Sequence, residues 1–300
     1  MNSISVGFKN YLVESKGLSA NSVSAYLRDA AEFENYLKEK GVHSVDDATR
    51  ADVAAWLLGL KQHEMSAATV NRKLASIRAY YKYSIDAGKA KEDPTEGIRS
   101  PRIKRKDIEY LSIDEVERLL TAPGDTDIGR RDQAVLEMMY ATGLRVTELM
   151  YVNVDDVNLR MGFVTCSGAH GKARIIPIGR PARAALEQYI YDIRPHLQRS
   201  KTPAEARKET ALFLNYYGER ITRQALWKIL KSYSEKANIE KKITPQILRN
   251  SFAVHMVQNG ADLNTLQELM GHEDPVATQA YLSVSKNRIK DVYDSAHPRA

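Results

Sequence analysis

Several features that would assign this chain to particular protein classes are scarce or missing. Its 300 residues contain one cysteine, Cys166, which excludes a disulfide within the chain and is typical of a reducing compartment. No apolar run approaches the ~20 residues of a membrane-spanning helix. Lys9, Asn10 and Glu14 interrupt any apolar stretch in residues 1–15, so no signal peptide is expected. We therefore expect a cytoplasmic protein without a membrane partner.

Acidic residues are missing from one short stretch that is rich in positive charge. The chain carries a formal net charge of +6, and residues 1–106 hold 18 basic against 13 acidic side chains. Five basic residues fall within eight positions: Arg99, Arg102, Lys104, Arg105 and Lys106. This cluster fits either a solvated linker or a strap that faces DNA phosphates, and charge alone supports both interpretations.

Apolar spacing and turn residues divide the chain into two domains. The first ninety residues repeat apolar side chains at helical spacing, as in the stripe from Val23 to Leu37 that Gly41 closes. Proline and glycine with few apolar anchors then indicate a linker. The expected parts are a helical domain (1–90), a basic linker (91–110), a second domain (111–285), and a C-terminal helix and tail (286–300).

The second domain is predicted to combine helices with a small β-sheet. Two short β-rich runs, Phe163–Ser167 and Arg174–Ile178, flank a glycine-containing turn, which predicts a hairpin. Thr244 and Pro245 are typical of the N-cap and first residue of a helix, which we expect to run to about Gln258. The predicted fold class is therefore mainly α with a small β-sheet.

Three short segments in the second half of the chain carry side chains suited to chemistry on phosphates. The segments are Ala141–Leu149, Thr244–Phe252 and Leu269–Tyr281. Together they supply Arg145, Arg249, His272 and Tyr281. A guanidinium can hold a phosphate by two parallel hydrogen bonds, and a phenol can attack phosphorus and retain the product covalently. The combination predicts phosphoryl transfer on a nucleic-acid backbone.

A structural interpretation of the same residues stays open at this point. Glu148 is an obvious salt-bridge partner for Arg145, so the arginines can be explained without catalysis. His272 taken alone fits a surface or capping role, and Tyr281 is one of 16 tyrosines.

Taken in order, the segments resemble the tyrosine recombinase (phage integrase) superfamily, and within it the Xer-type recombinases. The similarity extends over essentially the whole chain, from Leu18–Tyr26 through the basic linker and Lys172–Pro177 to His297–Ala300. The resemblance implies an N-terminal helical, SAM-like core-binding domain and a C-terminal mixed α/β catalytic domain. The two would form a C-shaped clamp around duplex DNA.

The resemblance also implies a role for each site residue. Tyr281 would attack the scissile phosphate, which gives a 3′-phosphotyrosyl bond and a free 5′ hydroxyl, and Arg145, Arg249 and His272 would act on the same phosphate. The basic linker residues, Lys172 and Arg174 would contact DNA. Four protomers, identical or paired with a paralogue, would act through a Holliday junction. No metal or cofactor would be needed, and residues 286–300 would be exchanged between protomers.

Two positions depart from the family pattern. The family has a lysine in the hairpin turn, which is expected to donate the proton to the leaving hydroxyl, and this chain has Ala169 at that position. The family also has a histidine three residues before its second arginine, and this chain has Gln246 there. Loss of a positioned proton donor commonly costs about 10²–10⁴-fold in rate, whereas the Gln246 amide can still donate a hydrogen bond. An introduced change at 169, natural attenuation, or a substitute donor such as Lys172 or His170 would each explain the alanine.

These departures keep a second function in view. A DNA-binding architectural or regulatory protein could retain the clamp and lose efficient strand transfer. The target sequence and the physiological task, whether chromosome dimer resolution, integration or inversion, are not specified by the residues.

Overall fold

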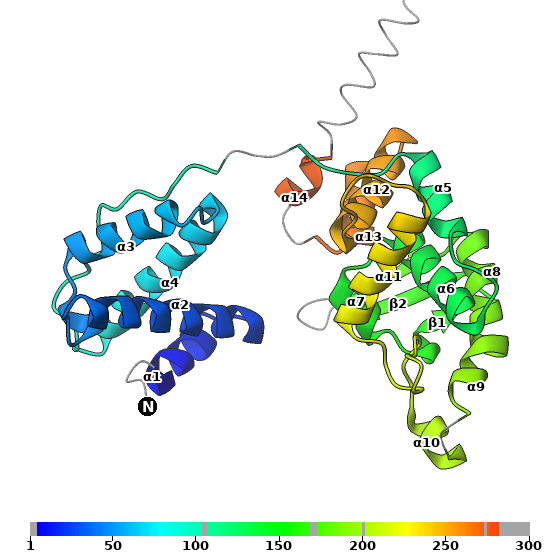
Figure 1. Ribbon diagram of the computed structural model, residues 1–300, viewed down its shortest axis with the longest axis horizontal. Coiled ribbons are helices and arrows are strands. Elements are labelled where there is room, and N and C mark those ends of the chain that lie inside the picture. Colours follow the sequence, from blue (N-terminus) through cyan, green and yellow to red (C-terminus); the bar gives the residue numbers. More distant parts are fainter. Residues whose placement is uncertain (1–4, 104–106, 168–172, 200–201, 273–274, 282–300) are drawn as a thin grey trace, which may run out of the picture. The chain divides into compact units, whose positions relative to one another are not determined.

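The protein forms two compact units, Met1–Lys106 and Asp107–Ala300, in a computed structural model (Figure 1). The structure describes residues 5–103, 107–167, 173–199, 202–272 and 275–281. Within these ranges no helix is both long and apolar enough to cross a bilayer. The mainly helical fold class with a small sheet is confirmed. The division between the units falls inside the predicted linker, whose limits at 91 and 110 stay predictions.

The N-terminal unit consists of helices around an apolar core. They are α1 (Ser5–Asn10), the π-helical turn η1 (Tyr11–Ser15), α2 (Ala20–Glu39), the 3-10 turn η2 (Val45–Asp47), α3 (Arg50–Gln62) and α4 (Ala67–Asp86). Serine or threonine side chains cap α2, α3 and α4 at Ser19, Thr49 and Ser66, which explains why these helices begin where they do. Phe33 of α2 and Tyr81 of α4 are fully buried in this core.

The middle of the predicted linker, residues 98–101, is bound to α4 by side-chain hydrogen bonds. Asn71 Nδ2 donates to the carbonyl of Pro101 at 2.9 Å, and Arg78 Nη2 donates to that of Ile98 at 2.5 Å. Asn71 and Arg78 lie seven residues apart, so they share one face of the helix. Residues 98–101 therefore belong to the N-terminal unit.

The C-terminal unit consists of helices and a small three-stranded sheet. Its first helices and turns are α5 (Ile113–Thr121), α6 (Asp127–Thr142), α7 (Val146–Tyr151), η3 (Val154–Asp156), α8 (Arg180–Gln188), η5 (Tyr189–Ile193) and α9 (Arg194–Leu197). The later helices are α10 (Pro203–Lys208), α11 (Arg223–Lys236), α12 (Pro245–Gln258), α13 (Leu263–Met270) and α14 (Pro275–Gln279). The strands are β1 (Val157–Asn158), β2 (Phe163–Ser167) and β3 (Ala173–Pro177).

The predicted hairpin is confirmed: it consists of β2 and β3, which pair antiparallel. The order of strands in the sheet is β1-β2-β3. Alternate residues face the core: Val164 lies opposite Ile176, and both are buried, whereas Ile175 is exposed. Strand β1, only two residues long, has too little sequence to show a period and was not predicted. Cys166 is buried on β2, and burial raises its thiol pKa to about 11, so it is unreactive near neutral pH.

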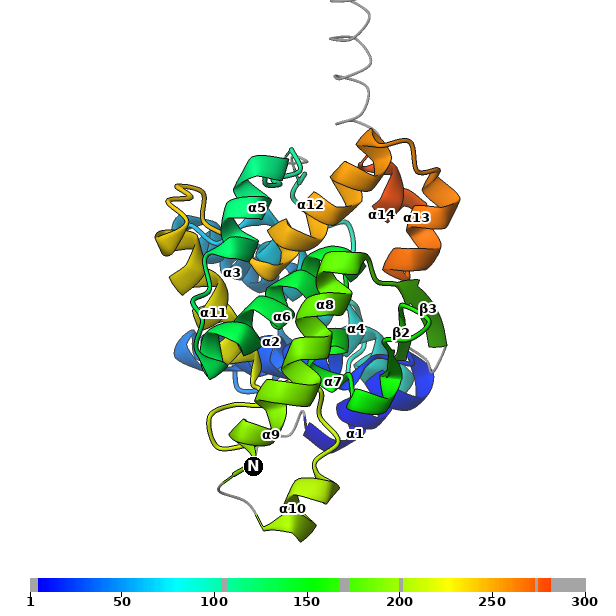
Figure 2. The same ribbon diagram turned by 90° about the vertical axis from the view of Figure 1, so that its right-hand side faces the viewer.

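Helix α6 is the central element of this unit. It is buried over most of its length, and α8 and α12 pack against it, as Figure 2 shows. The helix ends at Gly143, which adopts a left-handed conformation with φ of +57°. A Cβ atom at this position would lie 2.4 Å from Phe252 of α12, so glycine permits both the backbone turn and the close approach of the two helices. This junction places Arg145 at the N-terminus of α7.

Candidate active site

Three arginines from separate elements surround one carboxylate, Glu148 of α7. Arg145 Nη1 lies 3.1 Å from Glu148 Oε1, and Arg174 of β3 donates to both carboxylate oxygens at 2.8 and 2.9 Å. Arg249 of α12 lies 4.0 Å from Glu148 Oε2. The structure thus brings Arg145 and Arg249 together. It also forms the Arg145–Glu148 salt bridge of the structural interpretation, so the two interpretations are compatible.

The C-terminal end of α13 holds the same three guanidinium groups. Arg174 Nε donates to the carbonyl of Leu269 at 2.8 Å, Arg249 Nη2 to that of Met270 at 2.7 Å, and Arg145 Nη2 to that of Gly271 at 2.6 Å. Carbonyls at the end of a helix lack intrahelical partners and carry partial negative charge, which favours cations there. Three consecutive carbonyls therefore position three arginines.

The charges in this cluster do not cancel. Burial, followed by the charge of Arg145, lowers the pKa of Arg249 to about 10, so Arg249 stays protonated at neutral pH. Burial alone would raise the pKa of Glu148, but hydrogen bonds from Arg174 and from the Arg145 backbone hold it below its usual value. Three guanidinium groups thus face one carboxylate. The Arg145 side chain is 39% exposed, whereas that of Arg249 is 4% exposed, so Arg145 opens the cluster to an anion from solvent.

His272 contacts this cluster as a neutral imidazole. Burial and the charge of Arg249 lower its pKa to about 4. Its Nε2 lies 3.1 Å from Arg249 Nη2, and its Nδ1 lies 2.8 Å from Thr278 Oγ1. Because a guanidinium can only donate, Nε2 accepts and the proton is on Nδ1, which donates to the threonine. His272 thereby connects α12 to α14.

Tyr281 lies beside the cluster but its hydroxyl is directed to another residue. The residue is 5% exposed, and its hydroxyl donates to Asn250 Oδ1 at 3.0 Å. Burial raises the pKa of the phenol, while the charge of Arg249 acts in the opposite direction. The nucleophile expected from the sequence is therefore buried, protonated and hydrogen-bonded to the residue that follows Arg249.

The other predicted site residues have varied positions. Gln246 is exposed on α12, and its amide donates to Asn250 Oδ1 at 2.9 Å rather than reaching the arginines. Arg174 was expected to contact DNA; its side chain is 14% exposed and belongs to the arginine cluster. Arg99 and Arg102 are exposed in the N-terminal unit. The residues outside the described ranges are Lys104, Arg105, Lys106, Ala169 and Lys172, together with the segment 286–300.

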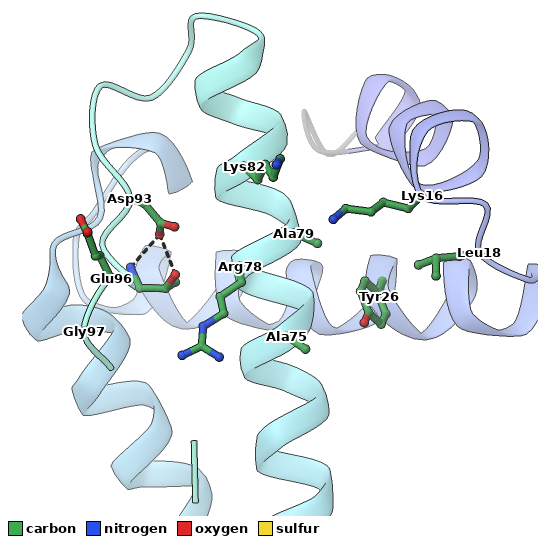
Figure 3. Close-up of a pocket in the computed structure, with 11 residues that line it drawn as sticks. Lys16, Leu18, Tyr26, Ala75, Arg78, Ala79, Lys82, Asp93, Glu96 and Gly97 are labelled. Carbon is green, nitrogen blue, oxygen red and sulfur yellow. Dashed lines mark hydrogen bonds between the residues drawn. The ribbon is translucent and has the colours of Figure 1, made fainter. Parts of the chain in front are cut away.

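Sequence reasoning missed several contacts of the site. Asn250 and Thr278 are polar residues in helical segments, and only the folded chain shows what they contact. A second missed feature is a groove of about 560 Å³ next to α4 in the N-terminal unit, whose lining includes Lys16, Arg78 and Lys82 (Figure 3). Arg78 and Lys82 are four residues apart on a helix, and this spacing was the available signal.

Comparison with known proteins identifies the family of the chain. Residues 109–288 match the model of the phage integrase family, and residues 6–88 match that of the phage integrase N-terminal SAM-like domain. The tyrosine recombinase XerD of Listeria monocytogenes serotype 4b is 42% identical over 302 residues, covering 100% of both chains. The tyrosine recombinase XerD of Oceanobacillus iheyensis is 43% identical over 294 residues, covering 98% of this chain and 97% of the relative.

A solved structure has a similar fold. It is the XerH site-specific recombinase bound to a palindromic difH substrate in a post-cleavage complex, with a TM-score of 0.75, 18% identity, and coverage of 95% of this chain and 82% of that chain. At this identity the likeness concerns the fold. The family match covers more than half of the sequence, and both relatives align over nearly their full length. The chain therefore belongs to the phage integrase family and is a tyrosine recombinase of the Xer type.

Proposed function

We propose that this site-specific DNA recombinase cleaves and rejoins duplex DNA through a covalent bond between Tyr281 and a 3′ phosphate. The observation that carries the proposal is the meeting of three arginines around Glu148, beside His272 and Tyr281. A surplus of guanidinium groups in a largely buried place is suited to the charged oxygens of a phosphodiester. Arg145, the most exposed of the three, would make the first contact.

In the proposed step one phosphorus–oxygen bond replaces another. The Tyr281 oxygen forms a bond to phosphorus while the bond from phosphorus to the 5′ oxygen breaks. The phenol loses its proton, and the leaving 5′ oxygen gains one. Arg145 and Arg249 stabilise the charge on the non-bridging oxygens. The 5′ hydroxyl of a partner duplex then attacks the phosphotyrosyl bond, which rejoins the strands and restores the tyrosine.

The site lacks the expected donor of a proton to the leaving 5′ oxygen. The turn position carries Ala169, which cannot donate a proton, and His272 already directs its proton to Thr278. We therefore propose that strand cleavage is attenuated in this sequence, with His170 and Lys172 as the candidate substitute donors near position 169.

Duplex DNA is the proposed partner, and basic side chains in the N-terminal unit are the proposed contacts beyond the active site. Arg99 and Arg102 are exposed, and Lys16 and Lys82 line the groove beside α4. Phosphate contacts of this kind supply most of the sequence-independent affinity for DNA. We further propose assembly of four protomers, identical or paired with a paralogue, and a cytoplasmic location. The XerH relative, captured with its DNA substrate after cleavage, supports the DNA partner.

The test is covalent capture on a nicked recombination-site duplex. Cleavage next to the nick releases a short fragment, so the protein stays attached to DNA and shifts in a denaturing gel. We expect an adduct that disappears in Tyr281→Phe and persists in the control Tyr217→Phe, since Tyr217 is 71% exposed on a loop. Ala169→Lys should raise the cleavage rate at least about tenfold, because it restores a proton donor.

One outcome would favour the alternative function. Salt-dependent binding to duplex DNA without any adduct, even after Ala169→Lys, would indicate an architectural or regulatory protein. Ala169 and Gln246 are the residues that motivate this alternative. Absence of DNA binding at low salt would contradict both functions.

A further inference from the structure

The hydroxyl of Tyr281 is engaged by a residue that the proposed reaction does not use. Asn250 Oδ1 accepts the Tyr281 hydroxyl at 3.0 Å and the Gln246 amide at 2.9 Å, while Asn250 Nδ2 donates to the carbonyl of Glu109 at 3.0 Å. We infer that Asn250 is a positioning residue that restrains the nucleophile, holding the phenol as a hydrogen-bond donor apart from the arginines until this contact breaks. The inference rests on the proposed function of Tyr281.

The direction of the hydrogen bond follows from the partners of Asn250. The carbonyl of Glu109 can only accept, so the amide nitrogen of Asn250 must point to it. The amide oxygen then faces Tyr281, and an amide oxygen is only an acceptor. The phenol hydroxyl must therefore donate. A hydrogen bond from the neutral phenol stabilises the protonated form, which is the form that cannot attack phosphorus.

Asn250 and Arg249 point to different sides of α12. Consecutive residues on a helix point about 100° apart at 3.6 residues per turn. Arg249 faces the carbonyls of Gly143 and Met270, whereas Asn250 faces Glu109. A phenol that is bonded to Asn250 is thus beside, and not within, the set of groups that would bind the phosphate. Attack in line requires the phenol to leave Asn250.

The Asn250 amide cannot move with the phenol, because residues 109–111, to which it is hydrogen-bonded, are themselves held by further hydrogen bonds. The backbone N–H of Leu111 donates to Ser251 Oγ at 2.9 Å, and Lys241 Nζ donates to the carbonyl of Tyr110 at 3.4 Å. With Glu109 bonded to Asn250, three successive residues are tied to α12 or to the loop before it. Asn250 is therefore a fixed anchor, and release of Tyr281 is a movement of the tyrosine.

The experiment compares two substitutions of Asn250. If Asn250 had only a structural role, both would change the cleavage rate in the same way. Both substitutions remove the amide donor to Glu109, so they differ only in the acceptor. Asn250→Ala has no acceptor, whereas Asn250→Asp has a carboxylate, which accepts more strongly and holds the proton more firmly. Asn259→Ala, an exposed asparagine at the end of the same helix, is the matched control. Single-turnover cleavage of the nicked duplex at saturating protein is measured against pH, together with the DNA dissociation constant. Thermal unfolding is measured for each variant.

A second readout reports the phenol itself and needs no DNA. Full-length protein labelled with ¹³C at tyrosine Cζ gives a Tyr281 signal that is assigned by its loss in Tyr281→Phe. Its titration with pH is compared between the unchanged protein and Asn250→Ala. We expect a lower pKa of Tyr281 in the alanine variant, since the bond that favours the neutral phenol is gone.

The two substitutions are expected to change the cleavage rate in opposite directions. Asn250→Ala should cleave on the order of 3- to 10-fold faster, as the loss of one neutral hydrogen bond implies, with an unchanged dissociation constant. Asn250→Asp should cleave more slowly than the unchanged protein. Equal rates in the two variants, or a Tyr281 titration that Asn250→Ala leaves in place, would overturn the inference. A shifted titration without an adduct in any variant would instead contradict the proposed function and support the hold of Asn250 on the phenol.

Discussion

At the scale of single residues, Glu148 determines whether the arginine cluster can exist. Its carboxylate is the negative charge that Arg145, Arg174 and Arg249 share among the described residues. Without it, three guanidinium groups would repel one another in a place where water reaches only one of them freely. The salt bridge expected as the structural explanation of Arg145 is thus what keeps the proposed phosphate site assembled.

Glu148→Gln tests this dependence. We expect the free energy of unfolding to fall by about 3 kcal/mol, the lower end for breaking a buried ion pair, because Arg145 keeps contact with solvent. Denaturant unfolding at pH 7 measures the change. Glu137→Gln on α6 is the control: burial raises the pKa of Glu137, so its ionised form costs stability and the amide should be neutral or stabilising. Equal losses in both variants would show that the cluster does not depend on Glu148.

At the scale of elements, helix ends place the site. Helix α6 ends at Gly143 and α13 at Gly271, both in the left-handed region, and the carbonyls of these two glycines accept from Arg249 and Arg145. A Cβ at Gly271 would lie 2.7 Å from Arg174 Nη1, so this turn also makes room for the third arginine. Two glycine-terminated helices thus decide where the guanidinium groups lie.

Gly143→Ala should therefore disturb both stability and the site. Left-handed backbone costs a residue with a Cβ about 1–2 kcal/mol, and overpacking against Phe252 adds about 1–3 kcal/mol. We expect a loss of about 2–5 kcal/mol in denaturant unfolding, with weaker cleavage of the nicked duplex. Gly260→Ala also has positive φ, at +93°, but nothing lies within 4 Å of its Cβ, so it should cost only the backbone term. Equal costs would contradict the role of the Phe252 contact.

At the scale of the whole molecule, the excess positive charge belongs mostly to the first unit. Residues 1–106 contribute +5 of the net +6, while the arginine cluster lies in the second unit. The proposed contacts with the DNA backbone and the proposed chemistry at one phosphate thereby fall to different parts of the chain. Affinity should follow the first unit and cleavage the second.

The double variant Arg99→Gln with Arg102→Gln separates DNA affinity from cleavage. If both exposed side chains contact phosphates, the slope of log affinity against log salt should become shallower by about 2, near 0.9 for each contact. Fluorescence anisotropy with a labelled duplex at several salt concentrations measures the slope. Arg118→Gln with Lys228→Gln changes the net charge equally from exposed positions on α5 and α11. The same slope change in this pair would assign the effect to net charge.

Local features of the chain determined much of the fold before any contact was known. The apolar stripe from Val23 to Leu37 predicted α2, and the N-cap pattern at Thr244 predicted the start of α12, because helix formation depends on spacing and capping within a few residues. The two-residue strand β1 and short α7 escaped prediction, since neither is long enough to show a period. The three segments, taken in their order along the chain, also sufficed to name Arg145, Arg249, His272 and Tyr281 as candidate site residues.

What the sequence by itself determined about this protein is thus its longer helices, its hairpin and the identity of the side chains that we propose take part in the reaction. Only the tertiary structure decided how these side chains are used. Arg174, expected at a DNA surface, supports Glu148; Gln246 faces Asn250; and Tyr281 donates to Asn250. These contacts join residues far apart in the chain, except along α12, and depend on how α6, α12 and α13 pack, which no local pattern of residues encodes.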